Sequence, residues 1–279
     1  MLVVDDLAAF HAPSGGAAVT VGAYDGVHIG HQRLIARLQA VAGERGLATA
    51  VVTFDRHPAF VVRPESAPKL LTDLGTKLEL LAATGVDYTV VVRFDAARSQ
   101  EPAEHFVRAV LVRSLDARVV AVGRDFHFGH GREGNVAFLE RLGPELGFEV
   151  IPVDLVDEGD GRDAKVSSTR VRACLAQGDV EAAAALLGRP HRVRGTVAVA
   201  GDGHVTVDVP PEDCLPAPGR YAGWYCGAEA RTACTVRVGT DHFVDAELPG
   251  AAPPVADDVA VVEFRAPMDG EAALRDTGT

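Results

Sequence analysis

The chain changes its hydrophobic pattern once, and this change limits the folds that it can adopt. Up to about residue 190, short β-rich apolar runs alternate with stretches of helical periodicity. Alternation of this kind is typical of βαβ crossovers, and so of a parallel sheet with helices on both faces. We predict strands at 17–22, 47–54, 88–94, 118–123 and 148–153, and helices at 31–45, 69–84, 102–114, 135–146, 168–177 and 180–187.

After the segment LGRP, residues 187–190, the helical periodicity is replaced by short alternating runs. Gly, Pro and Asp separate the runs, which read RVRGTVAVA, GHVTVDV, RTACTVRVG and DVAVVEF. A period of two predicts antiparallel strands, here in a small barrel or a sandwich. We therefore expect an α/β chain of two domains, 1–188 and 189–279.

Composition excludes several classes of function. The net charge of −12 argues against a broad nucleic-acid surface, although a local basic cluster could still bind a small phosphorylated substrate. No apolar run approaches the roughly 20 residues that cross a bilayer, and acids occupy the start where a signal peptide is basic. We expect a cytoplasmic protein with no membrane partner. Its cysteines form no CxxC pair and are expected to be structural thiols: Cys174, Cys214, Cys226 and Cys234.

The segment GAYDGVHIGH, residues 22–31, lies between the first predicted strand and the first predicted helix. Its glycines let the backbone approach a ligand, and free N–H groups at a helix start favour phosphate. His28 and His31 are three residues apart, so both imidazoles lie toward one side of the helix start. Two such groups could stabilise charge on a polyphosphate. The alternative is that His28 fills a loop and His31 caps the helix.

This segment resembles the HxGH signature of the nucleotidyltransferase superfamily. Within it, the similarity is to the GxFDGxHxGH form of bacterial FAD synthetases, the adenylyltransferase half of bifunctional riboflavin kinase/FAD synthetases. Four more segments are similar to blocks of that family in the same order. TFDRHP resembles TFxPHP, LLTDLGTKLELL resembles LLTxxxEKxxLL, VGRDFHFGHGREG resembles VGxDFxFGxxxxG, and KVSSTRVRACLAQGDVEAAAALLGRP resembles ISSTxIRxxLxxGdvxxAxxLLGRP. Ala23, Tyr24 and Arg56 depart from the usual Asn, Phe and Pro, and none of these changes removes a charged phosphate contact.

The resemblance implies a Rossmann-like sheet of the HxGH nucleotidyltransferase type and the reaction of FMN with ATP, giving FAD and pyrophosphate. His28 and His31 would bind the ATP phosphates and stabilise the transition state, with Mg²⁺ shielding the triphosphate. The remaining ATP-binding residues would be Gly22, Tyr24, Asp25, Gly26, Lys165, Ser167, Ser168, Thr169 and Arg172, with Arg170 assisting. The flavin would contact Phe54, His57, Pro58, Phe60, Asp125, Phe126 and Phe128. Taken alone, the segment SSTR would be an ordinary N-cap.

The C-terminal part resembles a riboflavin kinase barrel only in places. GRPHRVRGTVAV, PAPGRYAG and VAVVEFRAP are similar to barrel strands, but nothing matches the GFPTAN motif, whose Thr and Asn serve the MgATP of the kinase. We expect no C-terminal kinase helix, because few residues follow Met268 in this sequence. Asp208, Glu212 and Asp213 could hold a metal, but we expect exposed acids on a hairpin. The prediction is a structural or docking barrel without kinase activity.

Two other functions stay open. The departures from the family pattern could admit a different nucleotide or acceptor. A non-catalytic flavin or nucleotide sensor is ranked last, because such a protein is expected to lose an HxGH histidine or the SST–Arg segment, and this chain keeps both.

Overall fold

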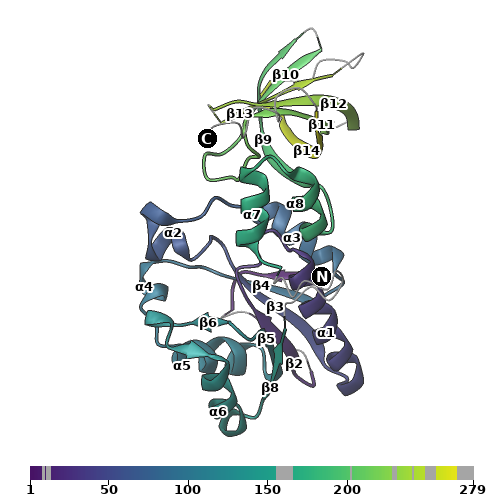
Figure 1. Ribbon diagram of the computed structural model, residues 1–279. Coiled ribbons are helices and arrows are strands. Elements are labelled where there is room, and N and C mark those ends of the chain that lie inside the picture. Colours follow the sequence, from purple (N-terminus) through teal and green to yellow (C-terminus); the bar gives the residue numbers. More distant parts are fainter. Residues whose placement is uncertain are drawn as a thin grey trace, which may run out of the picture. The chain divides into compact units, whose positions relative to one another are not determined.

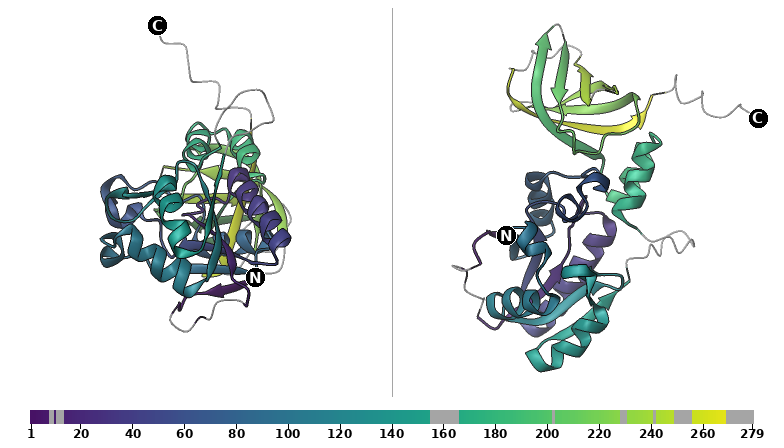
Figure 2. Two further views of the ribbon diagram at one scale, coloured as in Figure 1. Left: turned by 90° about the horizontal axis from the view of Figure 1, so that it is seen from below. Right: turned by 90° about the vertical axis from the view of Figure 1, so that its left-hand side faces the viewer.

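The computed structural model describes residues 1–7, 10, 14–154, 166–201, 203–227, 231–240, 242–248 and 256–268 (Figures 1 and 2). The chain forms two compact units. The first comprises residues 1–68 and 74–166, and the second comprises residues 69–73 and the chain from Ser167 onward. The functional boundary that the sequence motifs suggest, at residue 188, stays a prediction.

The first unit is built on a six-stranded sheet in the order β1-β4-β3-β2-β5-β8. Every neighbouring pair is parallel, which confirms the expected α/β class. The strands are β1 (Leu2–Val4), β2 (Ala17–Val21), β3 (Ala48–Phe54), β4 (Tyr88–Val92), β5 (Ala117–Gly123) and β8 (Glu149–Val153). The strand order reverses at β2, with β3 on one side and β5 on the other. In open α/β sheets, ligands bind beyond the carboxyl ends of the strands at such a reversal.

Helices cover both faces of this sheet, because alternate residues of each strand point to opposite sides. Ala17 and Val19 of β2 pack in a core cluster with α5 (Ala103–Phe106), its π-helical continuation η2 (Val107–Ser114), and α6 (Val136–Leu146). Ala18 packs on the other side, in a cluster formed with α1 (Ile29–Arg45). A neighbouring cluster adds α3 (Leu74–Ala83) to that side. Figure 1 shows α1 and α6 on opposite sides of the strands.

Short elements follow the carboxyl ends of the central strands and build the loops around the site. They are α2 (Ala59–Val62) and η1 (Pro64–Ser66) after β3, α4 (Ala96–Ser99) after β4, and β6 (His127–Phe128), η3 (His130–Arg132) and β7 (Gly134–Asn135) after β5. Strands β6 and β7 form a small antiparallel hairpin. The loops therefore carry structure of their own.

The predicted helices and sheet strands of the first unit are observed within a few residues, but the short loop elements α2, η1, α4, β6, η3 and β7 were not predicted, and three further differences concern the longer elements. The edge strand β1 was not predicted. The predicted helix 69–84 begins only at Leu74, because Leu70 is extended: its N–H donates to Glu212 O and its carbonyl accepts from Cys214 N, both at 2.7 Å. The predicted helix 102–114 exists, but from residue 107 onward it is a π-helix.

The second unit contains two helices and a closed antiparallel barrel. The helices are α7 (Ser168–Ala176) and α8 (Val180–Leu187). The barrel strands are β9 (His191–Gly201), β10 (His204–Asp208), β11 (Gly219–Cys226), β12 (Arg231–Val238), β13 (Phe243–Glu247) and β14 (Val259–Pro267), in the order β10-β13-β12-β11-β14-β9. Gly195 and Gly223 permit close backbone approaches, because a Cβ at either would lie 2.3 Å from a carbonyl oxygen. Of the sandwich and the barrel that the sequence allowed, the barrel is observed.

Other sequence expectations can be compared with the described residues. All four cysteines are free thiols, as expected. Asp208 and Glu212 are exposed as predicted, but Asp213 is buried. Within the described segments, no three His, Cys, Asp or Glu side chains gather as a metal site requires, and no helix is both long and apolar enough to span a membrane.

Candidate active site

The HxGH segment forms the start of α1, directly beyond β2. His28 is the N-cap residue, with extended backbone (φ −66°, ψ 169°), and its Nδ1 accepts the N–H of His31 at 3.3 Å. The cap is therefore His28, whereas the capping alternative in the sequence assigned this role to His31. Because Nδ1 accepts a hydrogen bond, the neutral imidazole of His28 carries its proton on Nε2. Capping thus leaves His28 with a hydrogen-bond donor on the opposite side of the ring.

The two imidazoles stack on each other. Their ring centroids are 3.6 Å apart and their planes differ by 13°. His28 is buried, while His31 is partly exposed but has a buried Nδ1 without a hydrogen-bond partner in the described part of the chain. Burial, and next the neighbouring His28, hold the pKa of His31 well below its usual value. The ligand-free site therefore keeps His31 neutral near pH 7.

Tyr24 lies in the turn and contacts both Thr20 of β2 and the ring of His31. Its backbone lies in the left-handed region (φ 51°), which is unusual for a residue with a bulky side chain. Its buried hydroxyl is hydrogen-bonded to Thr20 Oγ1 at 2.7 Å, and its ring lies 4.8 Å from that of His31. Burial raises the pKa of the Tyr24 hydroxyl. The hydroxyl that distinguishes this chain from the usual Phe is thus accommodated by Thr20.

A positive φ or a lack of space for a Cβ favours glycine at three positions of the turn, and the acid of the turn is buried. Gly26 adopts φ 81°, a value that favours glycine. A Cβ on Gly22 would lie 3.1 Å from the Tyr24 ring. A Cβ on Gly30 would lie 3.2 Å from His28 Nδ1 and 3.6 Å from the Cβ of Val166, the residue that precedes Ser167. Asp25 is buried within this turn, with 5% of its surface exposed.

The SSTR segment forms the start of α7 in the second unit. Ser167 is its N-cap and accepts the N–H of Arg170 at 3.3 Å, so the N-cap interpretation is correct for this residue. Ser168 and Thr169 follow in the first turn and are partly or fully exposed. Arg172 donates from Nε to the carbonyl oxygen of Lys69 at 2.5 Å. Lys165, also predicted to bind ATP, lies outside the described residues.

The predicted flavin residues after β3 lie at the carboxyl edge of the sheet. Phe54 ends β3, and its ring packs edge-on against Phe94 with centroids 5.2 Å apart. His57 Nδ1 accepts the N–H of Ala59 at 3.2 Å and so helps to start α2. The predicted members of this loop are all partly exposed: Phe54, His57, Pro58 and Phe60.

The predicted flavin residues after β5 divide into an exposed and an anchored part. Asp125 is exposed. Phe126 and Phe128 stack at 5.3 Å with planes 15° apart, and Phe128 also packs against Phe106 and Phe138. Both rings pack against the hydrophobic core of the first unit, but only Phe128 is described in further ring contacts, which leaves the ring of Phe126 as the better candidate for contact with a flat ligand.

Two charged residues for which the sequence predicted no role, Asp55 and Lys77, form hydrogen bonds to the backbone of these loops. Asp55 Oδ1 accepts the N–H of Phe94 at 2.8 Å, which joins the ends of β3 and β4. Lys77 of α3 is buried, and its Nζ donates to the carbonyl oxygen of Phe54 at 2.8 Å. The signal that could have identified Lys77 was its position in the segment LLTDLGTKLELL, where it coincides with the Lys of the block LLTxxxEKxxLL.

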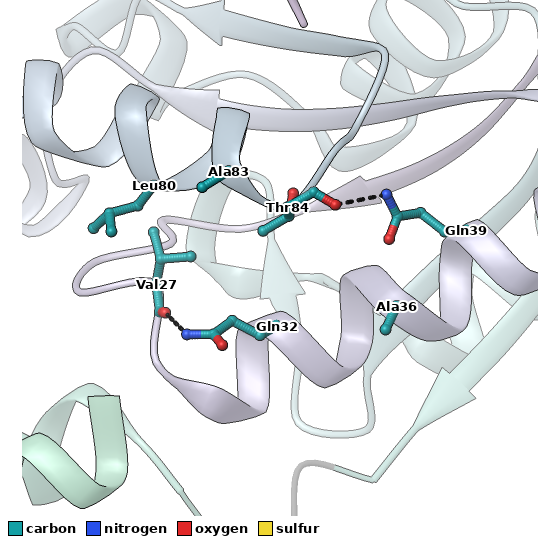
Figure 3. Close-up of a pocket in the computed structure, with 7 residues that line it drawn as sticks. All are labelled: Val27, Gln32, Ala36, Gln39, Leu80, Ala83 and Thr84. Atoms are coloured by element: carbon teal, nitrogen blue, oxygen red, sulfur yellow. Dashed lines mark hydrogen bonds between the residues drawn. The ribbon is translucent and has the colours of Figure 1, made fainter. Parts of the chain in front are cut away.

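A pocket of about 270 Å³ lies between α1 and α3, behind the turn (Figure 3). The residues that line it are Val27, Gln32, Ala36, Gln39, Leu80, Ala83 and Thr84. Gln32 and Gln39 donate from Nε2 to the carbonyls of Val27 and Thr84, at 2.8 and 2.9 Å. No charged side chain lines this pocket, so it does not suit a polyphosphate, and it does not include either histidine.

Comparison with known proteins agrees with this geometry. The family model for FAD synthetase matches residues 11–170. The bifunctional riboflavin kinase/FMN adenylyltransferase of Escherichia coli K12 is 39% identical over 218 residues, which are 76% of this chain and 68% of that protein. The protein of the same name from Pseudomonas fluorescens is 40% identical over 182 residues, 65% of this chain and 57% of the relative.

A solved structure, described as a macrolide-efflux protein from Streptococcus pneumoniae, has the same fold. Its TM-score is 0.82, and the match covers 96% of this chain and 91% of the other. At 22% identity this similarity concerns the fold alone. The family match, in contrast, spans both histidines and the loops after β3 and β5, and the chain therefore belongs to the FAD synthetase family.

Proposed function

We propose that this nucleotidyltransferase transfers AMP from ATP to FMN, producing FAD and pyrophosphate. The observation that carries the proposal is the stacked pair of His28 and His31 at the N-terminus of α1, beyond β2, where the strand order reverses. A helix N-terminus with free N–H groups favours phosphate, and the loops of the neighbouring strands β3 and β5 carry aromatic rings. The names of the curated relatives support this reaction.

The chemistry requires positioning and charge stabilisation. An oxygen of the FMN phosphate attacks the α-phosphorus of ATP, a new P–O bond forms, and the bond from this phosphorus to the oxygen that bridges to the β-phosphorus breaks. Pyrophosphate leaves with the electron pair. The attacking phosphate is already ionised, so no general base is needed. Mg²⁺ bound to the ATP would neutralise part of the triphosphate charge.

The histidines supply donors to this charge. The neutral ring of His28 donates from Nε2, because its Nδ1 is occupied by the backbone N–H of His31. His31 is neutral without ligand, but negative phosphate oxygens favour the charged imidazolium and would raise its pKa. A charged donor gives the stronger hydrogen bond to phosphate. We therefore propose that His31 gains a proton as the nucleotide binds.

The family resemblance also assigns Ser168, Thr169 and Arg172 to the phosphates of ATP. Hydroxyls of Ser168 and Thr169 in the first turn of α7 can donate to phosphate oxygens, as can the guanidinium of Arg172. Arg172→Lys should raise the KM for MgATP about tenfold, because an ammonium does not reproduce a bidentate contact. An unchanged KM would restrict Arg172 to its bond with Lys69.

The test is a direct assay of FAD formation. Purified protein is incubated with FMN and MgATP, and the flavins are separated chromatographically. His28→Ala should lower kcat about 10²–10³-fold, with FMN affinity nearly unchanged, because one donor to the developing charge is lost. His204→Ala is the matched control, since His204 is exposed on β10 of the barrel. Near-wild-type turnover by His28→Ala would contradict the proposed role.

We further propose that the barrel does not phosphorylate riboflavin. In the family resemblance, the Thr and Asn of a GFPTAN motif serve the MgATP of the kinase, whereas this chain reads AGDGHVTVDVPPEDCL in that region and has no counterpart of the motif. The barrel is proposed to serve as a structural or docking module.

The assay for kinase activity needs a variant that does not consume the product. His28→Ala protein is incubated with riboflavin and MgATP, so that any FMN formed accumulates. We expect no FMN above the level of a reaction without protein. Accumulation of FMN in proportion to protein concentration would refute the proposal.

A further inference from the structure

The candidate for a further role is Lys77, a lysine inside the first unit. It lies on α3 with only 7% of its surface exposed. Lysine is rarely buried unless its ammonium is hydrogen-bonded, because removing a charge from water is costly. Its Nζ donates to two backbone carbonyls, of Phe54 at 2.8 Å and of Ala23 at 3.4 Å. The ammonium thus joins segments 31 positions apart in the chain, since 54 − 23 = 31.

Each of the two carbonyls lies in or next to a loop of the proposed active site. Ala23 is in the turn after β2 that continues to Tyr24 and His28, and Phe54 is the last residue of β3, directly before the proposed flavin loop. Strands β2 and β3 are paired as far as Val21 and Val52, and the N–H of Gly22 donates to Val52 O at 3.0 Å. Ala23 comes one residue after Gly22, and Phe54 comes two residues after Val52.

Side-chain hydrogen bonds reach both segments beyond that point. Thr53 Oγ1 donates to Ala23 O at 3.2 Å, and Lys77 Nζ donates to the same oxygen and to Phe54 O. Thr53 is fully buried. The carbonyl of Ala23 therefore receives two buried donors, and these donors determine how far the nucleotide turn lies from the flavin loop.

The position of Ala23 also affects the histidines. The next residue is Tyr24, held in a left-handed conformation with its ring 4.8 Å from that of His31. A shift of the Ala23 carbonyl would change the backbone angles at Tyr24 and move its ring. In transfer reactions a displacement of about 1 Å between reacting groups can lower the rate about 10²-fold.

We propose that Lys77 is a positioning residue of the transfer reaction: its ammonium joins the nucleotide turn to the flavin loop and sets the distance between the two substrates. The inference rests on the proposed function, because it treats the two loops as the sites of ATP and FMN. Lys77 itself need not touch either substrate.

The test compares Lys77→Met with the wild-type enzyme. Methionine keeps the length and the burial of the side chain but donates no hydrogen bond. We expect kcat for FAD formation to fall about 10–100-fold, while KM for MgATP and for FMN changes less than about threefold, because each loop is intact and only their spacing changes. Lys77→Arg, which retains donors, should recover part of kcat.

A control separates positioning from stability. Leu38→Ala removes a fully buried side chain of α1 that packs in a different core cluster, about two helical turns beyond His31. It should lower the melting temperature without changing kcat per folded molecule. If Lys77→Met lowers the melting temperature but keeps the wild-type kcat, Lys77 is only a structural residue and the proposal is wrong.

Two further measurements test the proposal even if Lys77→Met does not fold or FMN is not the acceptor of AMP. Thr53→Val removes the second donor to Ala23 O, and it should lower kcat about 3–10-fold even if Lys77→Met does not fold. The ring resonances of His31 in NMR spectra of the ligand-free protein should shift in both variants and stay in place in Leu38→Ala. Unshifted resonances would overturn the inference. Absence of FAD formation by the wild-type enzyme would instead refute the proposed function.

Discussion

The hydroxyl of Tyr24 provides a quantitative test of the turn beneath the histidines. Its only described hydrogen bond is to Thr20 Oγ1, at 2.7 Å, and both side chains are buried, with 1% and 0% of their surfaces exposed. Tyr24→Phe restores the residue usual in the family but leaves the Thr20 hydroxyl without this partner. An unsatisfied buried hydroxyl costs about 1–3 kcal/mol. We expect Tyr24→Phe to lower the free energy of unfolding of the first unit by that amount.

A double-mutant cycle isolates the pair. Thr20→Val alone should cost a similar amount, because it leaves the Tyr24 hydroxyl unpaired. The double variant should lose less than about 1 kcal/mol, since replacing both polar partners by apolar groups is nearly neutral. The loss of unfolding free energy in the double variant should therefore be smaller than the sum of the two single losses by at least about 1 kcal/mol.

The assay must distinguish the two units. Urea unfolding is followed by far-ultraviolet circular dichroism, to which the helices of the first unit contribute most, and by the fluorescence of Trp224. This is the single tryptophan and lies on β11 of the barrel. Tyr24→Phe should shift the dichroism transition and leave the fluorescence transition in place. If the two single effects add in the double variant, the hydroxyls are not coupled and the reasoning fails.

Three further predictions concern other parts of the molecule. Gly30→Ala should lower kcat at least about tenfold, because its Cβ would press on the His28 ring. The melting temperature should not fall, since alanine favours the helix over glycine by about 1 kcal/mol. Equal turnover in the variant and the wild type would show that the ring adapts. The pKa of His31, measured by NMR titration, should lie below its usual value in the free protein and rise when MgATP binds, and the opposite shift would contradict the phosphate contact. Burial lowers the pKa of His191 in the barrel to about 4. The unfolded chain therefore binds more protons below pH 6.5, and the free energy of unfolding of the barrel should fall by up to about 3 kcal/mol between pH 6.5 and 4. When unfolding is followed by tryptophan fluorescence, the free energy of unfolding of His191→Leu should fall less steeply with decreasing pH than that of the wild type. An identical pH dependence in the two proteins would refute this prediction.

Local signals in the sequence were sufficient for the elements and for the location of the histidines. The segment from Ala17 to Arg45 contains an apolar run, a glycine-rich turn and a helical period, and each is read within a few neighbouring residues. The structure has β2 and α1 there, with His28 at the N-cap. The same holds for α8, whose predicted and observed bounds are identical.

Where distant residues compete for the backbone, local signals were insufficient. Leu70 lies in a segment with a helical pattern, but its N–H and carbonyl are taken by residues 212 and 214, so the segment is extended. Strand β1 has only three residues and no alternating pattern of its own, and its pairing with β4 forms it. Neither outcome can be read from a window of neighbouring residues, because the deciding partner is far away in the sequence.

The chemical state of the site also depends on the tertiary structure. The residue types can be read from the chain alone: two histidines three positions apart, glycines around them, and aromatic residues in two later loops. Only the folded chain stacks the histidines, occupies Nδ1 of His28 and buries Nδ1 of His31, which sets where their protons lie. Only the folded chain brings Lys77 to Ala23, which is 54 positions away in the sequence, and to Phe54, which is 23 positions away. The physical reason is that burial and hydrogen bonding, which control pKa and position, arise from packing between elements and not from the order of residues within one.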